Sequence, residues 1–361
     1  MELRIEDVTH LDVRGGTTKV AGCAWREHRP RWGELLIDVI GRNGPWLEGL
    51  RPSFSSVPRV ADILSMHESR PSTSRTQSGA KPQPRDVDPR AEADALLERV
   101  RQGETELPVL PDTAAAVLAA CRNDDSGPRQ IALALERDPG LAAELLRVAN
   151  SAAYSAGGSV VSLHQAIGRL GMSAVATITT AVAVKGRVFS VPRFASEVAQ
   201  VWSHSASASA WAREIARQRR RNVEGAFLCG LMHDVGRPLM LQAFAKLEAG
   251  GARFDPAALA AAVDDLHPHI GAELVMRWGL PAWAADSVRW HGDPWLAVDH
   301  RDEALTTALA SHLAHGVLGD ALERDEIKEL ALRDELGLYP EDFEELLARR
   351  EHVLEVAAAL T

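Results

Sequence analysis

Apolar positions follow three different patterns along the chain. Residues 1–66 contain short stretches in which apolar and polar residues alternate, with Gly15 and Gly16 between two of them. This period of two predicts β-strands joined by a turn. Residues 67–92 are rich in Ser, Pro, Arg and Gln and hold few apolar side chains. From residue 93 onward the apolar residues recur at helical spacing, which predicts a succession of helices.

These patterns predict a mainly α protein with four segments. A small β-containing N-terminal module is expected over residues 1–66. Residues 67–92 cannot bury enough apolar surface to offset the entropy lost on ordering, so they are expected to form a disordered, flexible linker. An all-α helical bundle follows over residues 93–300, and the C-terminal helices of residues 301–361 are expected to pack on it.

Capping residues and one apolar run define the helices of this bundle further. Asp112, Asp138 and Ser162 each precede an apolar helical run and are residue types that cap helix N-termini. Ala174–Val184 is a nearly continuous run of small and apolar residues, longer than a typical strand. We interpret it as a central buried helix, and its Thr and Val content keeps a strand as the alternative.

Composition limits the class of protein. The chain has 361 residues, 25% charged and 46% hydrophobic, with a formal net charge of -10; these values are ordinary for a globular protein and argue against general nucleic-acid binding, which needs clustered Lys and Arg. Cys23, Cys121 and Cys229 lie far apart, which argues against a disulfide framework. The sequence shows no signal segment and no apolar run of about 20 residues, so we expect a cytoplasmic protein without a membrane span.

Two local clusters are candidates for contacts with a protein partner. The first cluster is a basic run that includes Arg219, Arg220 and Arg221. It is interpreted either as a solvated helix C-terminus, where the helix dipole favours cations, or as a docking patch for an acidic partner. The tryptophans are the second cluster, because exposed aromatic residues dominate interface energetics. Self-association through the C-terminal helices is a further alternative. The candidate partner-binding residues are Arg219, Arg220, Arg221, Trp283, Trp290 and Trp295.

Several histidines fall at helical positions that face inward. His204 shares a helical face with Trp211, His233 and Asp234 follow an apolar helix, His267 precedes an expected helix start at Pro268, and His291 closes a further helix. A single inward imidazole commonly bonds a backbone carbonyl. Four of them beside a carboxylate are typical of a divalent metal site. The candidate metal ligands are His204, His233, Asp234, His267 and His291, and the candidate ions are Mn, Fe, Zn and Mg.

A series of motifs in fixed order carries a family resemblance. The motifs are Leu107–Pro111, Arg137–Leu141, Ala149–Ser155, Leu163–Gly171, Gly230–Gly236, His267–Gly271 and Arg277–Pro281. Over about residues 100–295 this series resembles the HDOD domain, the HD-related output domain of bacterial signalling proteins. The resemblance implies an all-α fold related to HD-type metal phosphohydrolases. It also implies a regulatory or scaffolding role without established catalysis.

The resemblance assigns roles to individual positions. His204 resembles the first histidine of the HD pattern, and His233 with Asp234 resembles its defining pair. His267 and His291 resemble later histidines of the HD-GYP phosphodiesterases. Two positions depart from the pattern: Gly292 stands where these families often have a second histidine, and Ser311 stands where a closing carboxylate is expected.

Three functions remain open at this point. The first is a non-catalytic signal-transduction output protein that acts by binding protein partners. The second is a metal-dependent phosphohydrolase that uses a residual HD site, and the third is a regulatory domain that binds a nucleotide. Two metals about 3.5–4 Å apart need several carboxylates, and Asp234 is the one well-placed candidate. Asp264, Asp265 and Asp293 are expected at helix ends or in a turn, which favours the first function.

Overall fold

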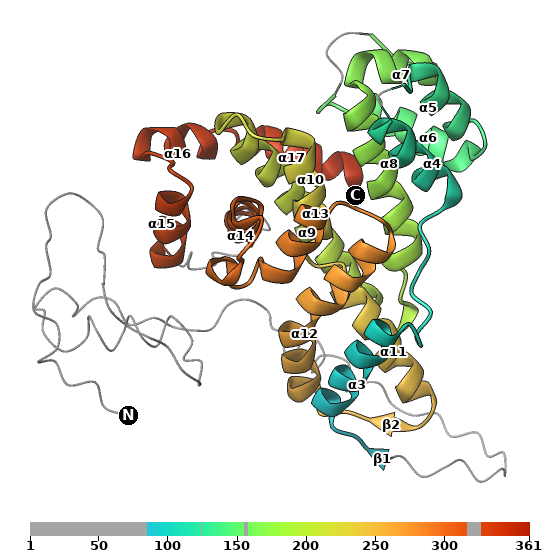
Figure 1. Ribbon diagram of the computed structural model, residues 1–361, viewed down its shortest axis with the longest axis vertical. Helices are drawn as coiled ribbons and strands as arrows, with labels where there is room; N and C mark the ends of the chain where they lie inside the picture. The colour runs from blue at the N-terminus through green and yellow to red at the C-terminus, as the bar shows by residue number, and fades with distance from the viewer. Residues whose placement is uncertain (1–84, 124, 155–157, 316–325) are drawn as a thin grey trace, which may run out of the picture. The chain divides into compact units, whose positions relative to one another are not determined.

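The computed structural model describes residues 85–361 except residues 124, 155–157 and 316–325. The predicted N-terminal module and most of the predicted linker therefore lie outside the described residues. The described part is mainly helical, which confirms the predicted fold class (Figure 1). The helices are α3 (Pro89–Gln102), α4 (Asp112–Arg122), α5 (Pro128–Leu135), α6 (Pro139–Ala149), α7 (Leu163–Leu170), α8 (Met172–Val188), α9 (Ala195–Gln218), α10 (Val223–Met232), α11 (Gly236–Ala249), α12 (Pro256–Arg277), α13 (Ala282–Trp290), α14 (Arg301–His315), α15 (Glu326–Glu335), α16 (Pro340–Leu347) and α17 (Arg350–Leu360), with short 3₁₀ helices η3 (Pro192–Phe194) and η4 (Pro294–Leu296).

Side-chain caps begin several of these helices. Asp138 accepts a hydrogen bond from the Leu141 backbone N–H at the start of α6, and Ser162 accepts one from Gln165 at the start of α7. Both N-caps were predicted, and each satisfies a backbone donor that the first helical turn leaves unpaired. Asp112 is instead the first residue of α4, because Pro111 holds the cap position.

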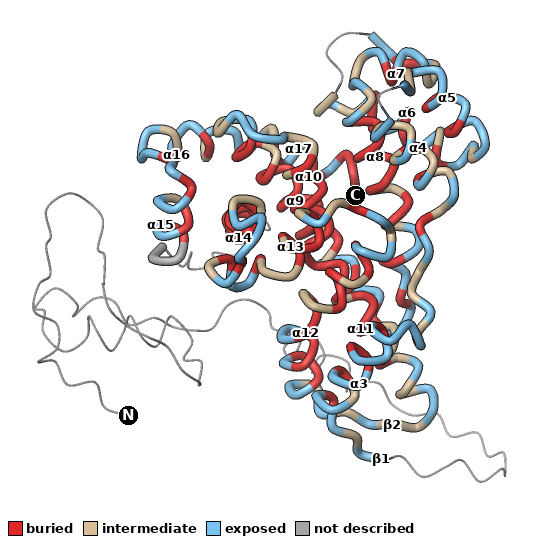
Figure 2. Tube along the Cα trace, viewed as in Figure 1, coloured by how far each residue is buried: buried red, intermediate tan, exposed pale blue. Residues whose placement is uncertain are grey.

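Helix α9 lies at the centre of the packing, against α10, α14 and α17. Figure 2 shows α9 and α10 buried over most of their length. Alternating Ser and Ala residues keep this part of α9 narrow, and Gly230 of α10 approaches it closely: a Cβ at Gly230 would lie 2.7 Å from the Ala208 carbonyl oxygen. The close approach brings His204 of α9 next to the C-terminal end of α10.

The run Ala174–Val184 is part of the buried helix α8, which confirms the helical interpretation over the strand. Among the described residues, no individual helix has both the length and the hydropathy needed to cross a bilayer. Only α7 and α8 taken together meet those criteria, and they are bent by 115°.

Two boundaries differ from the sequence prediction. A helix start at Pro268 is wrong, because α12 begins at Pro256 behind the Asp255 cap and continues through Pro268. Proline removes one helical hydrogen bond, but α12 packs against α3, α11 and α13, and these contacts hold it in one piece. Residues 89–92, placed in the linker by composition, form the first turn of α3, because Asp88 caps that helix and Pro89 suits its first position.

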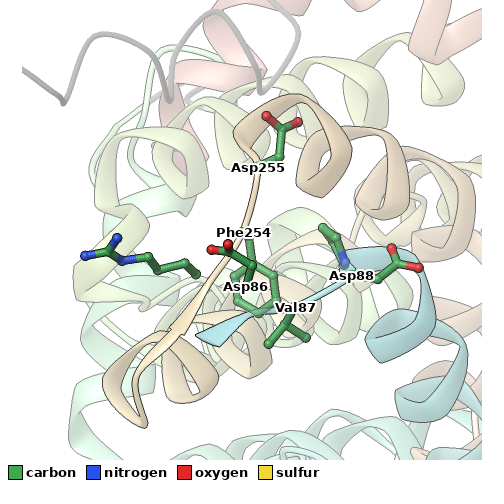
Figure 3. Close-up of a pocket in the computed structure, with 7 residues that line it drawn as sticks. Asp86, Val87, Asp88, Phe254 and Asp255 are labelled. Atoms are coloured by element: carbon green, nitrogen blue, oxygen red, sulfur yellow. The ribbon is translucent and has the colours of Figure 1, made fainter. Parts of the chain in front are cut away.

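A two-stranded parallel pairing joins the starts of α3 and α12. Strand β1 (Arg85–Asp86) pairs with β2 (Ala252–Arg253), and a surface pocket of about 520 Å³ lies beside them (Figure 3). Asp88 and Asp255 line this pocket. Both carboxylates accept backbone N–H bonds as helix caps, so their role here is structural.

Candidate metal centre

Five predicted residues meet in the interior of the bundle. His204 lies within α9, His233 is the C-cap of α10, and Asp234 follows it directly. His267 lies within α12, and His291 is the C-cap of α13. All five are buried. The structure therefore brings together every candidate ligand that the sequence analysis named, from four helices.

Backbone carbonyls fix the orientation of three imidazoles. The Nδ1 atom of His233 lies 2.7 Å from the Gly230 carbonyl oxygen. His267 and His291 make the same kind of contact with Val263 and Val288, at 3.0 and 2.8 Å. A carbonyl oxygen only accepts, so each Nδ1 carries the proton and donates. The neutral form of each ring therefore directs the Nε2 lone pair toward the cluster, as metal-binding histidines do.

The two carboxylate oxygens of Asp234 divide the cluster into two parts. We call Asp234 Oδ1 with the Nε2 atoms of His267 and His291 the Oδ1 half-site; the two nitrogens lie 3.0 and 3.9 Å from Oδ1. We call Asp234 Oδ2 with the Nε2 atoms of His204 and His233 the Oδ2 half-site; these nitrogens lie 4.0 and 3.5 Å from Oδ2. In each group the potential ligand atoms lie within 4.8 Å of one another.

Arg237 is a further member of the cluster that the sequence analysis missed. Its Nε donates to Asp234 Oδ1 at 2.9 Å, and its Nη1 donates to Asp264. Burial raises the pKa of Asp234, but the charge of Arg237 and the nearby His233 and His267 outweigh it and hold that pKa well below its usual value. Asp234 is therefore ionised. Arg237 follows Asp234 by three residues across the start of α11, and that spacing was the available signal.

Helix α14 supplies two more polar groups. Ser311 Oγ lies 3.1 Å from His204 Nε2, and the ring of His315 stacks on that of His204 with a centroid separation of 4.2 Å. His315 was also missed, although it follows Ser311 by four residues on the same helix face. Ser311 therefore contributes a neutral hydroxyl next to His204.

Burial keeps most of these imidazoles neutral. It lowers the pKa values of His204 and His291 well below the usual range, and neighbouring imidazoles lower them further. Burial and the charge of Arg237 lower the pKa of His267. For His315 burial lowers the pKa to about 4. A set of neutral nitrogens around one carboxylate is the form that binds a divalent metal.

The residues predicted to bind a partner lie in different surroundings. Arg219 donates to both carboxylate oxygens of Asp302, at 2.6 and 2.9 Å, and to the Leu336 carbonyl oxygen. These contacts inside the fold use its donors, so its assignment to a free docking patch is corrected. Arg220 and Arg221 are exposed, and partner binding stays a prediction for them. The same holds for Trp283, Trp290 and Trp295, which are all partly buried.

Comparison with known proteins assigns this chain to a family. A family model described as the HDOD domain matches residues 107–294, a range that contains the five predicted ligands but not Ser311 or His315. An uncharacterized protein of Treponema pallidum (strain Nichols) is 24% identical over 217 residues. That match covers 58% of this chain and 42% of the relative, so the chain spans about two fifths of the relative's length.

Solved structures share the fold. A "Putative metal-dependent phosphohydrolase" from Shewanella amazonensis SB2B has a TM-score of 0.62 and 23% identity, over 76% of this chain and 99% of that chain. A "Putative phosphohydrolase" from the same organism has a TM-score of 0.57 and 26% identity, over 74% and 98%. A "Putative signal transduction protein" from Marinobacter aquaeolei VT8 has a TM-score of 0.57 and 24% identity, over 75% and 65%.

Proposed function

We propose, since this chain belongs to the HDOD family, that it is a non-catalytic signal-transduction protein whose helical domain acts by binding protein partners. The observation that carries the proposal is the charge of the buried cluster. Among the described residues, Asp234 is the single carboxylate in either half-site, and Arg237 already neutralises it. By the resemblance, Ser311 stands where a closing carboxylate is expected.

A two-metal hydrolase needs more negative charge than this cluster offers. Two divalent cations held about 3.5–4 Å apart repel each other strongly, and carboxylate or bridging ligands offset that repulsion. Here four imidazoles and one ion-paired carboxylate occupy the site. The same side chains join α9, α10, α12 and α13 through buried contacts, which supports a structural role for the cluster within a partner-binding scaffold.

The name of one related structure is consistent with signalling, since the Marinobacter protein is described as a signal transduction protein. At 24% identity that likeness supports the fold of the scaffold. Arg220 and Arg221, together with the tryptophans of α13 and η4, are the proposed contacts with the partner.

A turnover assay with a matched variant tests the non-catalytic proposal. The full-length protein and Asp234→Ala are incubated with bis(p-nitrophenyl) phosphate and with cyclic dinucleotides, in the presence of Mn²⁺, Fe²⁺, Zn²⁺ or Mg²⁺. We expect both proteins to match the protein-free control, while Asp234→Ala melts at a lower temperature. Metal-dependent turnover in the wild type that disappears in Asp234→Ala would refute the proposal.

A metal-dependent phosphohydrolase is the second candidate. The convergence of imidazole Nε2 atoms on Asp234 favours it, as does the 26% identity to a protein described as a phosphohydrolase. His204, His233, Asp234, His267 and His291 would hold the metal, which would supply a hydroxide from water near neutral pH. Elemental analysis after incubation with Mn, Fe or Zn tests it. Less than a tenth of a metal ion per chain would exclude this function.

A further inference from the structure

The two half-sites differ in how well they are prepared for a cation. In the Oδ1 half-site, the His267 and His291 Nε2 atoms lie 3.4 Å apart, and they lie 3.0 and 3.9 Å from Asp234 Oδ1. Ligand bonds of about 2.0–2.2 Å around one first-row ion place neighbouring ligand atoms roughly 3.0–3.5 Å apart. Two of the three separations fall in this range, and the third exceeds it by a few tenths of an ångström.

The hydrogen-bonding state of this half-site also points to a cation. His267 and His291 donate from Nδ1 to backbone carbonyls, so in their neutral forms both Nε2 atoms are acceptors. The two nitrogens and Oδ1 then form one set of converging ligand atoms. Arg237 donates its Nε–H to Oδ1 and its Nη1–H to Asp264, so it donates to neither nitrogen. A divalent cation at the centre of this set would be bound by all three ligand atoms.

The Oδ2 half-site is arranged differently. His204 Nε2 contacts the Ser311 hydroxyl at 3.1 Å and lies 4.0 Å from Oδ2. Its Nδ1 is buried and has no hydrogen-bond partner among the described residues, so no carbonyl fixes the tautomer that a metal requires. The neutral hydroxyl of Ser311 adds no negative charge. In this half the Gly230 carbonyl orients His233, but His204 has no such anchor and its Nε2 atom is in contact with the Ser311 hydroxyl.

Charge limits the number of ions further. One divalent cation beside the Asp234–Arg237 pair leaves a net charge of about +2 in a buried site, and a second would double it. Asp264, which contacts Arg237, is about half exposed. Because burying uncompensated charge is costly, the cluster suits a single ion.

We propose that this chain binds one divalent cation, in the Oδ1 half-site, and that Ser311 is the reason that the Oδ2 half-site takes none. Two imidazoles and one carboxylate favour Zn²⁺, Co²⁺ or Fe²⁺ over Mg²⁺, which prefers oxygen ligands. This departs from a two-metal HD centre. The inference goes beyond the proposed function, because it concerns occupancy and holds whether or not any substrate is turned over.

Metal stoichiometry in the full-length protein tests the proposal. Metal-stripped protein is dialysed against Co²⁺ or Zn²⁺ and the bound ion is measured by elemental analysis, with the Co²⁺ absorption spectrum as a second readout. We expect one ion per chain in the wild type and weaker uptake of Mg²⁺. His291→Ala is expected to lose the ion, and the matched variant His204→Ala to keep it. Two ions in the wild type, none at all, or loss in His204→Ala alone would overturn the assignment.

Ser311→Asp provides a gain-of-binding test that does not depend on deleting a ligand. A carboxylate at this position would lie next to His204 Nε2, so we expect two ions per chain and a second component in the Co²⁺ spectrum. A stoichiometry that stays at one would refute the role given to Ser311. Circular dichroism verifies that each variant is folded. If His291→Ala does not fold, His291→Gln replaces it. The turnover assay of the proposed function is independent of these readouts, so each idea can fail alone.

Discussion

Replacing Arg237 with methionine tests the charge balance of the cluster most directly. Arg237→Met keeps most of the aliphatic volume and removes the cation that faces Asp234, whose side chain is 8% exposed. Removing one partner of a buried ion pair costs about 3–5 kcal/mol, because the other charge stays buried without compensation. Arg237 is 21% exposed, and His267 remains 3.0 Å from Oδ1 and can take up a proton. We therefore expect a loss of about 2–4 kcal/mol in the free energy of unfolding.

Urea denaturation of metal-free protein at pH 7.5, followed by circular dichroism, measures this loss, and a companion melt is expected to show a drop of roughly 5–10 °C. Asp264→Asn is the matched control: it removes the other partner of Arg237, which is 47% exposed, and is expected to cost less than about 1 kcal/mol. The double variant Arg237→Met/Asp234→Asn should recover part of the loss. A loss below about 1 kcal/mol for Arg237→Met, or a double variant less stable than the single one, would refute the buried-pair argument.

Three further predictions concern pH and packing. The buried imidazoles with lowered pKa values keep the metal-free fold at its full stability above their unfolded pKa of about 6.5. Below that pH the free energy of unfolding falls, by up to about 1.4 kcal/mol per pH unit for each group. Thermal melts from pH 7.5 to 5.0 should show a falling melting temperature, and an unchanged one would contradict this prediction. Gly236→Ala should prevent folding, because its Cβ would lie 2.0 Å from a backbone oxygen of α12, whereas Gly168→Ala, with nothing within 4 Å, should raise the melting temperature slightly; comparable soluble yields of the two would count against the close contact. Arg219→Ala should lower stability by about 1–2 kcal/mol through loss of the bidentate contact with Asp302, while Arg220→Ala should leave the melting temperature unchanged; equal melting temperatures of these two variants would remove the structural role of Arg219.

The cluster could be predicted because its residues carry strong local patterns. His233 and Asp234 follow the apolar helix α10, and His291 follows α13 directly. Their inward direction follows from the helical period. The resemblance then placed the imidazoles in one site. Asp138 and Ser162 were likewise recognisable as caps, because capping needs only the residue and its position before an apolar run.

Other features depend on contacts between distant segments and had no such local pattern. Arg237 and Asp264 meet only because α11 and α12 pack together, and charged residues near helix ends are usually solvated. The role of His315 requires the stacking of α14 on α9. The continuity of α12 through Pro268 was also outside local rules, since proline normally ends a helix and only packing on three sides holds this one together.

The buried imidazoles of the cluster have a consequence for folding. His204 and His315 are 111 positions apart in the sequence, and the other residues of the cluster lie between them on separate helices. The cluster therefore exists only when the whole bundle is assembled. Contacts of such long sequence separation form late in folding, after the local helices. Unfolding of any one of these helices would separate the ligand atoms from one another. A cation that binds only the assembled set would therefore stabilise the complete bundle by mass action. Occupancy of this centre would then report on the integrity of the entire domain.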